Sequence, residues 1–244
     1  MRVDDEDVAE IENKHYKVLC NYAAEFIHMG NIDADEIKQR MKYKNIELMQ
    51  TLLKEHKYVC CYCGHMAGYE WFVGLPLWIK DVAMCNFYQA SNYELLDNWI
   101  CKRRSQFGAI NINIKYPLRK ILQLKEEIEH GHSPYNSMII GSLADLSPKS
   151  SSSSTEATLF DYKISVLTGT ERIAKKLNAA FLYAKISLIR QGYYEIELKE
   201  LKPSNPADEN AYTIEYVKEL EKNVKEQPEL WMMWHRNLPL IEVH

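Results

Sequence analysis

The middle of the chain alternates strand-like apolar runs with helix-like segments. The strand-like runs are 58–63, 82–90 and 137–144, and periodic helical patterns cover 93–105 and 116–130. Parallel strands need a crossover connection, which is usually a helix, so this order predicts an α/β fold. We expect a layered structure with a largely parallel central sheet and helices on its faces.

Other patterns precede and follow this alternating region. Apolar residues at helical spacing predict an amphipathic helix over 6–28, and Asp33 is a candidate N-cap for the helix after it. Towards the other end, "FLYAKISLI" and "YYEIELKEL" are separated by three residues, 190–192. Such a short connection predicts an antiparallel strand pair, and the pattern over 212–226 predicts a last helix.

Length and composition indicate one domain over residues 1–244. The chain has 244 residues, of which 46% are apolar, enough to bury a sizeable core. We divide it into an N-terminal helical part (1–57), an α/β core (58–201) and a C-terminal helix and tail (202–244). The polar run "SPKSSSSST" is predicted to be a surface loop within the core rather than a domain boundary.

Charge and hydropathy exclude some classes of protein. A formal net charge of −4 and a pI near 6.1 argue against a protein that binds nucleic acid over its whole surface. The sequence has no run of 18 apolar residues, and it opens on the acidic "MRVDDEDVAEIE" rather than on a signal peptide. We therefore expect no transmembrane segment.

Three of the six cysteines lie close together, at positions 60, 61 and 63, just before His65. In a strand, Cys61, Cys63 and His65 would share one face while Cys60 points to the other. Structural zinc sites usually draw their ligands from two separated knuckles. Buried thiols in a reducing, cytoplasmic setting are therefore expected, and a metal-binding module is an alternative.

The stretch "CGHMAGYEW" places Glu70 five residues after His65. In a regular helix such a pair would lie about 140° apart, so the side chains meet only if the chain turns between them. Gly68 supplies that turn, and Glu70 would fall in the first turn of a new helix. We predict that His65 is a general base and that Glu70 orients its ring. The same spacing at His28 and Asp33 has a structural explanation, a helix end followed by a cap.

Several further blocks follow in a fixed order: "CKRRSQFGA", "GSLADLSP", "LTGTERIAKKLNA", "RQGYYEIEL" and "QPELWMMWHRN". Together with "CGHMAGYEW", they resemble the lysophospholipid acyltransferase superfamily, and in particular the bacterial lipid A biosynthesis acyltransferases that add secondary acyl chains. The resemblance covers nearly the whole chain and implies the layered fold of that superfamily.

The resemblance implies transfer of a fatty acyl group from an acyl-carrier-protein or CoA thioester to a hydroxyl of a lipid A precursor or related lipid. It implies no metal or other cofactor. His65 would take the proton from the attacking hydroxyl, and Glu70 would stabilise the resulting imidazolium.

The resemblance also implies substrate-binding roles for Arg104, Asp145, Gly169 and Glu171. Arg104 would lie beside a substrate phosphate or the developing oxyanion, for which its fixed fork of donors is suited. Asp145 would either support the residues that touch the substrate or position the acceptor itself. The alternative for Arg104 is a solvated, basic helix end together with residues 102–103.

Two blocks depart from the family pattern. Ala67, Gly68 and Tyr69 stand where the family carries Gly-Asn-Trp, and Asn237 and Leu238 replace an expected Arg-Trp. The sequence also begins inside the family's amphipathic stretch, so most of its N-terminal hydrophobic helix is missing here. A catalytically inactive relative that binds a lipid or a partner is therefore an alternative.

The expected location is peripheral, on the cytoplasmic face of the inner membrane. Apolar and basic surface around the site would contact lipid, and no nucleic-acid partner is expected. An acidic carrier protein would dock against basic residues that are close in sequence, namely Lys102, Arg103, Lys115, Arg119 and Lys120.

Overall fold

The computed structural model describes residues 5–146, 148, 153–233 and 241–242. Part of the serine run and the segment with Asn237 and Leu238 lie outside these residues. The helices are α1 (Asp5–His28), α2 (Ala34–Arg40), α3 (Ile46–His56), α4 (Glu94–Ser105), α5 (Pro117–Glu129), α6 (Gly169–Lys176) and α7 (Ala211–Glu226), with 3-10 helices η1 (Met29–Asn31), η2 (Tyr69–Leu77) and η3 (Pro228–Leu230). The strands are β1 (Met41–Tyr43), β2 (Tyr58–Cys63), β3 (Val82–Tyr88), β4 (Ile110–Asn113), β5 (Ser137–Leu143), β6 (Ser154–Leu159), β7 (Tyr162–Leu167), β8 (Ala180–Arg190), β9 (Tyr193–Glu200) and β10 (Ile241–Glu242).

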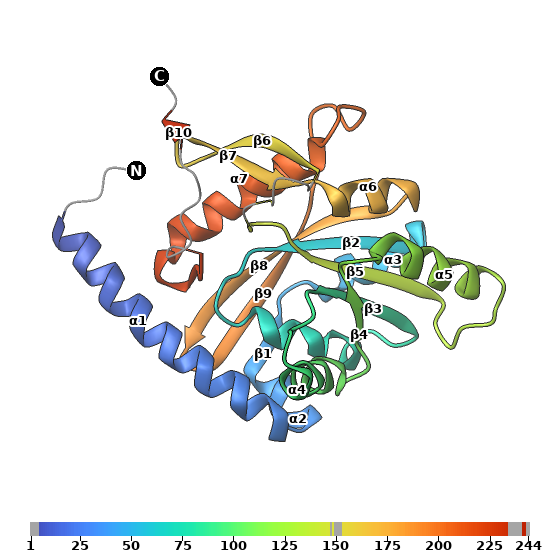
Figure 1. Cartoon of the computed structure of the whole chain (residues 1–244), viewed down its shortest axis with the longest axis horizontal. Coiled ribbons are helices and arrows are strands. Elements are labelled where there is room, and N and C mark those ends of the chain that lie inside the picture. The colour runs from blue at the N-terminus through green and yellow to red at the C-terminus, as the bar shows by residue number, and fades with distance from the viewer. Residues whose placement is uncertain (1–4, 147, 149–152, 234–240, 243–244) are drawn as a thin grey trace.

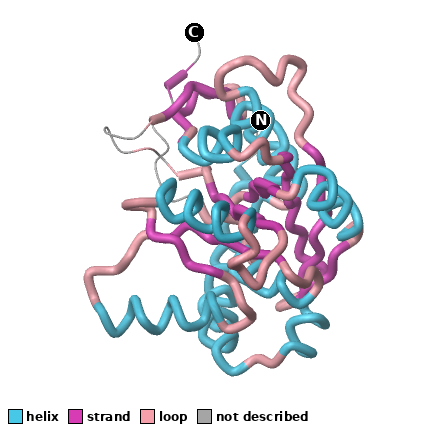
Figure 2. The backbone as a smooth tube through the Cα atoms, turned by 90° about the vertical axis from the view of Figure 1, so that its right-hand side faces the viewer, coloured by secondary structure: helices cyan, strands magenta, loops and turns pink. Residues whose placement is uncertain are grey.

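Seven strands form one sheet in the order β1-β9-β8-β2-β5-β3-β4. Neighbouring strands are parallel except for β8 and β9, which form the predicted antiparallel pair. Figure 1 shows α6, α7 and the β6–β7 hairpin along one side of this sheet and α2 and α4 on the opposite side. The layers are also visible in the rotated view of Figure 2. The structure thus confirms the α/β fold with a largely parallel sheet.

The sequence had suggested a helical N-terminal part, but the structure places a strand in it. Strand β1 lies within 1–57 and pairs with β9 at the edge of the central sheet, with Met41 opposite Tyr194. A three-residue strand carries too little alternation to be recognised from sequence alone. The sheet therefore extends beyond the predicted core, 58–201, into the N-terminal part.

The hairpin β6–β7 and the short strand β4 were also not predicted. The hairpin begins at Ser154, so the last residues of the predicted serine loop belong to a strand. Its alternating burial places Ala157 and Leu159 inwards, while Ser154, Glu156 and Thr158 are exposed. Flanking serines concealed this alternation, because a serine tract is typical of a loop.

Strand β2 runs through the core, and each of its six residues is buried. Parallel partners lie on both sides of it, β5 and β8. Cys60, Cys61 and Cys63 are free thiols there, and burial raises the pKa of each. These cysteines are therefore neutral core residues, as their apolar surroundings predicted.

Asp33 forms the predicted cap. Its Oδ1 accepts hydrogen bonds from the backbone N–H groups of Asp35 at 3.0 Å and Glu36 at 2.8 Å, at the start of α2. His28 does not bond to Asp33, and its Nε2 lies 2.8 Å from Glu36 Oε1. The second histidine–acid spacing is thus explained by helix capping and a surface contact.

Replacing Asp33 by alanine should lower the free energy of unfolding by roughly 0.5–2 kcal/mol, because two amide donors lose their acceptor. Chemical denaturation measures this loss. Asp35→Ala is the matched control, since Asp35 is exposed in the first turn and caps nothing. Equal losses in the two variants would contradict the capping role.

Candidate active site

The pairing of β2 with β5 brings His65 and Asp145 together. Cys63 is opposite Leu143 in this parallel pair, and each strand is followed two residues later by one of the two side chains. His65 Nδ1 lies 2.6 Å from Asp145 Oδ1, and the backbone N–H of His65 donates to Asp145 Oδ2 at 2.8 Å. These two contacts fix the rotation of the imidazole ring.

Asp145 has a third donor, the indole of Trp231. Trp231 Nε1 donates to Asp145 Oδ2 at 2.9 Å, and the Asp145 side chain is only 2% exposed. Burial opposes its ionisation, but the contacts with His65 and Trp231 outweigh burial and lower the pKa of Asp145. Asp145 is therefore a charged carboxylate with both oxygens engaged.

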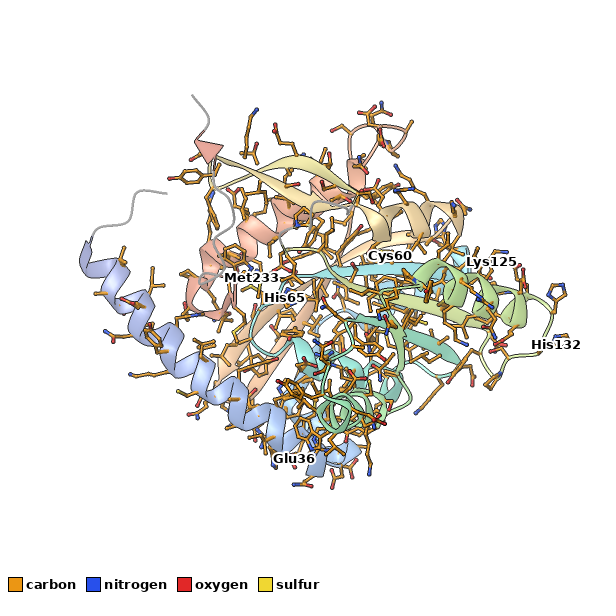
Figure 3. All side chains as sticks on the ribbon, viewed as in Figure 1. Glu36, Cys60, His65, Lys125, His132 and Met233 are labelled. Atoms are coloured by element: carbon orange, nitrogen blue, oxygen red, sulfur yellow. The ribbon has the colours of Figure 1, made fainter. Side chains whose placement is uncertain are left out.

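The segment 228–232 also holds the backbone around His65. Leu230 O accepts from Ala67 N at 2.7 Å, and Met232 N donates to His65 O at 2.9 Å. Figure 3 shows His65 beside Met233 at one end of β2, with Cys60 farther along the strand. The loop after β2 is thus fixed by a segment more than 160 residues later in the sequence.

Glu70 does not contact His65, contrary to the predicted orienting role. Its carboxylate accepts two hydrogen bonds from Arg104, one from Nε at 2.9 Å and one from Nη2, and a third from the Tyr22 hydroxyl at 3.4 Å. Gly68 turns the chain with a φ of +91°, and a Cβ there would meet the Tyr194 ring. After this turn η2 directs Glu70 towards α4 and α1, so that Asp145 rather than Glu70 contacts the imidazole.

The Glu70–Arg104 pair is largely buried. Burial disfavours the charged guanidinium, but the contacts with Glu70 dominate and raise the pKa of Arg104. Arg104 is therefore not part of a solvated helix end. Within the described residues its Nη1 has no hydrogen-bond partner, so one face of the fork is available to a ligand.

Tyr69 connects the two groups of residues. Its ring packs edge-on against the His65 ring, with centroids 5.2 Å apart, and its hydroxyl lies 2.9 Å from that of Tyr22. Tyr22 belongs to α1, which Figure 1 shows running diagonally along one side of the molecule. His65 with Asp145 and Glu70 with Arg104 thus form one contiguous site, bordered by α1.

Gly169 and Glu171 lie on α6, away from these contacts. The Glu171 carboxylate is buried and accepts from Thr213 N at 2.7 Å and Thr213 Oγ1 at 2.6 Å, at the start of α7. Lys175 pairs with it at 2.8 Å. Nothing lies within 4 Å of the position that a Cβ at Gly169 would take. These contacts give Glu171 a structural task, and a substrate role for either residue stays a prediction.

Sequence reasoning missed Trp231 and Tyr22 as members of the site. Asp145 was named, but not as the partner of His65. The predicted parallel strands 58–63 and 137–144 could have indicated that partnership, because their ends share an edge. Within the described part of the chain, no cluster of three or more His, Cys, Asp or Glu side chains is arranged to hold a metal ion.

A family model described as bacterial lipid A biosynthesis acyltransferase matches residues 4–239. The chain belongs to this family. It is therefore an acyltransferase of the lipid A type, with a lipid acceptor and an acyl donor. No curated protein matches the chain. None of the described helices is long and apolar enough to cross a membrane.

Asp145 should make the stability of this acyltransferase depend on pH in the acid range. Its pKa in the folded chain lies below the ordinary value of 3.8. The stabilising contribution is therefore fully present above about pH 4 and is lost as pH falls through the folded pKa. Asp145→Asn should lower the free energy of unfolding by roughly 1–3 kcal/mol at neutral pH.

Denaturation at a series of pH values compares the two proteins. The difference between wild type and Asp145→Asn should start to shrink as pH falls below about 4 and should vanish below the folded pKa of Asp145, where both side chains are neutral. A difference that stays constant down to pH 2 would show that Asp145 stabilises the fold without being charged.

Proposed function

We propose that this acyltransferase moves a fatty acyl group from an acyl-carrier-protein or CoA thioester to a hydroxyl of a lipid A precursor or related lipid. The observation that carries the proposal is the geometry at His65. Asp145 holds Nδ1, and Nε2 has no hydrogen-bond partner within the described residues. A neutral imidazole held in this way presents Nε2 as a base.

In the proposed reaction, Nε2 takes the proton from the acceptor hydroxyl as its oxygen attacks the thioester carbonyl. Asp145 stabilises the imidazolium that forms. The tetrahedral intermediate then collapses, the carbon–sulfur bond breaks, and the leaving thiolate receives the proton from His65. The products are the ester and the free thiol, so the base is restored at the end of each cycle.

Arg104 supplies positive charge to this reaction. Glu70 occupies Nε and Nη2, so the guanidinium is held at a fixed angle with Nη1 free for a substrate oxygen. Such a preorganised donor suits the developing oxyanion or a phosphate of the acceptor. Glu70 therefore acts in the proposal through Arg104, as a positioning residue, and Asp145 orients the base.

The proposed setting is peripheral, at the cytoplasmic face of the inner membrane, where a lipid acceptor and a soluble thioester donor meet. The second candidate function is that of an inactive relative that binds lipid or a partner. The observation that favours it is the altered turn, Ala67 to Tyr69, after which Glu70 faces away from His65. Acyl transfer from a carrier-protein thioester to lipid A precursors distinguishes the two.

His65→Ala should reduce acyl transfer by about 10²- to 10⁴-fold, because a positioned general base typically contributes this much. Turnover with a carrier-protein thioester and a lipid A precursor measures the effect. His28→Ala is the matched control and should leave turnover unchanged, since the hydrogen bond of the His28 ring within the described residues is to Glu36, which is not part of the site. A folded His65→Ala protein with full activity would refute the assignment.

Glu70→Gln and Asp145→Asn should differ in their pH–rate profiles. Asp145→Asn removes the charge that favours the imidazolium, so the acid limb of activity should move to lower pH. Glu70→Gln should lower turnover but leave that limb in place, because its charge acts on Arg104. The opposite pattern would assign the orienting role to Glu70, as the sequence had suggested.

A further inference from the structure

Helix α4 contains no buried residue, although two leucines lie in its first turn. Leu95 is 88% exposed, the adjacent Leu96 is exposed as well, and Tyr93 just before the helix is 76% exposed. A surface helix normally turns its apolar side chains to the core. Here the contacts of α4 with the rest of the molecule include the ion pair between Arg104 and Glu70 and the edge-on packing of Trp99 against Phe26, and the two leucines take no part in them.

The loop after β4 adds further exposed apolar side chains. Tyr116 is 74% exposed, and Ile114 is also exposed. Ile114 N donates to Tyr88 O at 3.0 Å, which joins the ends of β3 and β4. Since these strands are parallel neighbours, the segments that follow them lie at the same edge of the sheet. We call this surface the α4 face, formed by Tyr93, Leu95, Leu96, Ile114 and Tyr116.

Exposed basic residues accompany the α4 face. Lys102 lies seven residues after Leu95, two helical turns farther on, and so projects from the same side of α4. Lys115 stands between the two apolar residues of the β4 loop, and Arg119 follows in the first turn of α5. Glu94 and Asp97 are the acidic residues next to the leucines, two against the three basic residues. The local charge is therefore positive, although the chain is acidic as a whole.

We infer that the α4 face docks onto an anionic lipid surface. Leucine and tyrosine side chains enter the interfacial region of a bilayer, and lysine and arginine pair with its anionic head groups. An acidic carrier protein would match the positive charge, but this alone gives no reason to expose five apolar side chains to water. The combination of both features favours lipid.

The location of the α4 face fits the proposed reaction. The inference rests on the proposed function in one respect, namely that the acceptor is a lipid. His65 follows β2, and the α4 face follows β3 and β4, at the same edge of one parallel sheet. Strands β2 and β4 are three spacings apart, or about 14 Å. Docking through the α4 face therefore brings the edge that carries His65 towards the membrane.

Co-sedimentation with vesicles tests the inference without any turnover. Wild type should bind vesicles of equal parts phosphatidylcholine and phosphatidylglycerol more strongly than vesicles of phosphatidylcholine alone, and added salt should weaken the binding. Leu95→Glu should weaken binding to the mixed vesicles by at least about tenfold, because it removes an inserted apolar side chain and adds a repelled charge. Lys102→Glu should weaken it as well.

Ile189→Glu is the matched control, because Ile189 is 62% exposed and lies on β8, on the other side of β2 from β3 and β4. It changes the net charge by the same amount and should bind vesicles as wild type does. Equal losses in both variants would overturn the assignment to the α4 face, as would full binding by Leu95→Glu.

A second measurement separates this inference from the proposed function. With donor and acceptor dispersed in detergent micelles, Leu95→Glu should transfer acyl groups at the wild-type rate, whereas His65→Ala should not. If Leu95→Glu binds vesicles normally but uses the carrier-protein donor poorly, the α4 face belongs to the donor and the inference is wrong. Lipid binding by a wild type without transferase activity would refute the proposed function alone.

Discussion

The parallel pairing of β2 with β5 is the constraint on which the site depends. Each strand ends two residues before a functional side chain, so the register that aligns Cys63 with Leu143 also aligns His65 with Asp145. A shift of one residue would turn one of the two side chains to the opposite face. The apolar strands that fill the core thus also determine the geometry of the pair His65–Asp145.

Burying a carboxylate at this position is costly unless its oxygens are hydrogen-bonded. The structure satisfies Asp145 with three donors: the ring and backbone of His65 and the indole of Trp231. Trp231 arrives on a segment that also pairs with the backbone of residues 65–67. His15 on α1 supports that segment, since its Nδ1 lies 2.8 Å from Glu229 O. The charged carboxylate of Asp145 beside His65 therefore depends on contacts from both ends of the described chain.

Glu70, the acidic residue five positions after His65, pairs with Arg104 and not with the imidazole. Glu70 and Arg104 neutralise each other in a mostly buried setting, and Tyr22 and Tyr69 join this pair to the imidazole. The two carboxylates of the site thus have different partners: Asp145 contacts the imidazole of His65, and Glu70 contacts the guanidinium of Arg104. Each carboxylate therefore acts on the charge of a different group.

The sequence by itself determined the fold class, the family, the cap at Asp33 and the position of His65 at a strand end. These follow from local patterns, namely periodicity, capping chemistry and ordered motifs, which neighbouring residues specify. The short strands β1 and β4 were not predicted, because three or four residues are too few to show the alternation of a strand. The partners of His65 and Glu70 were decided only by tertiary structure. Asp145 and Trp231 lie 80 and 166 positions from His65, and strand register and helix packing bring them there. Spacing along the chain suggested Glu70, but the left-handed turn at Gly68 directs that carboxylate to Arg104.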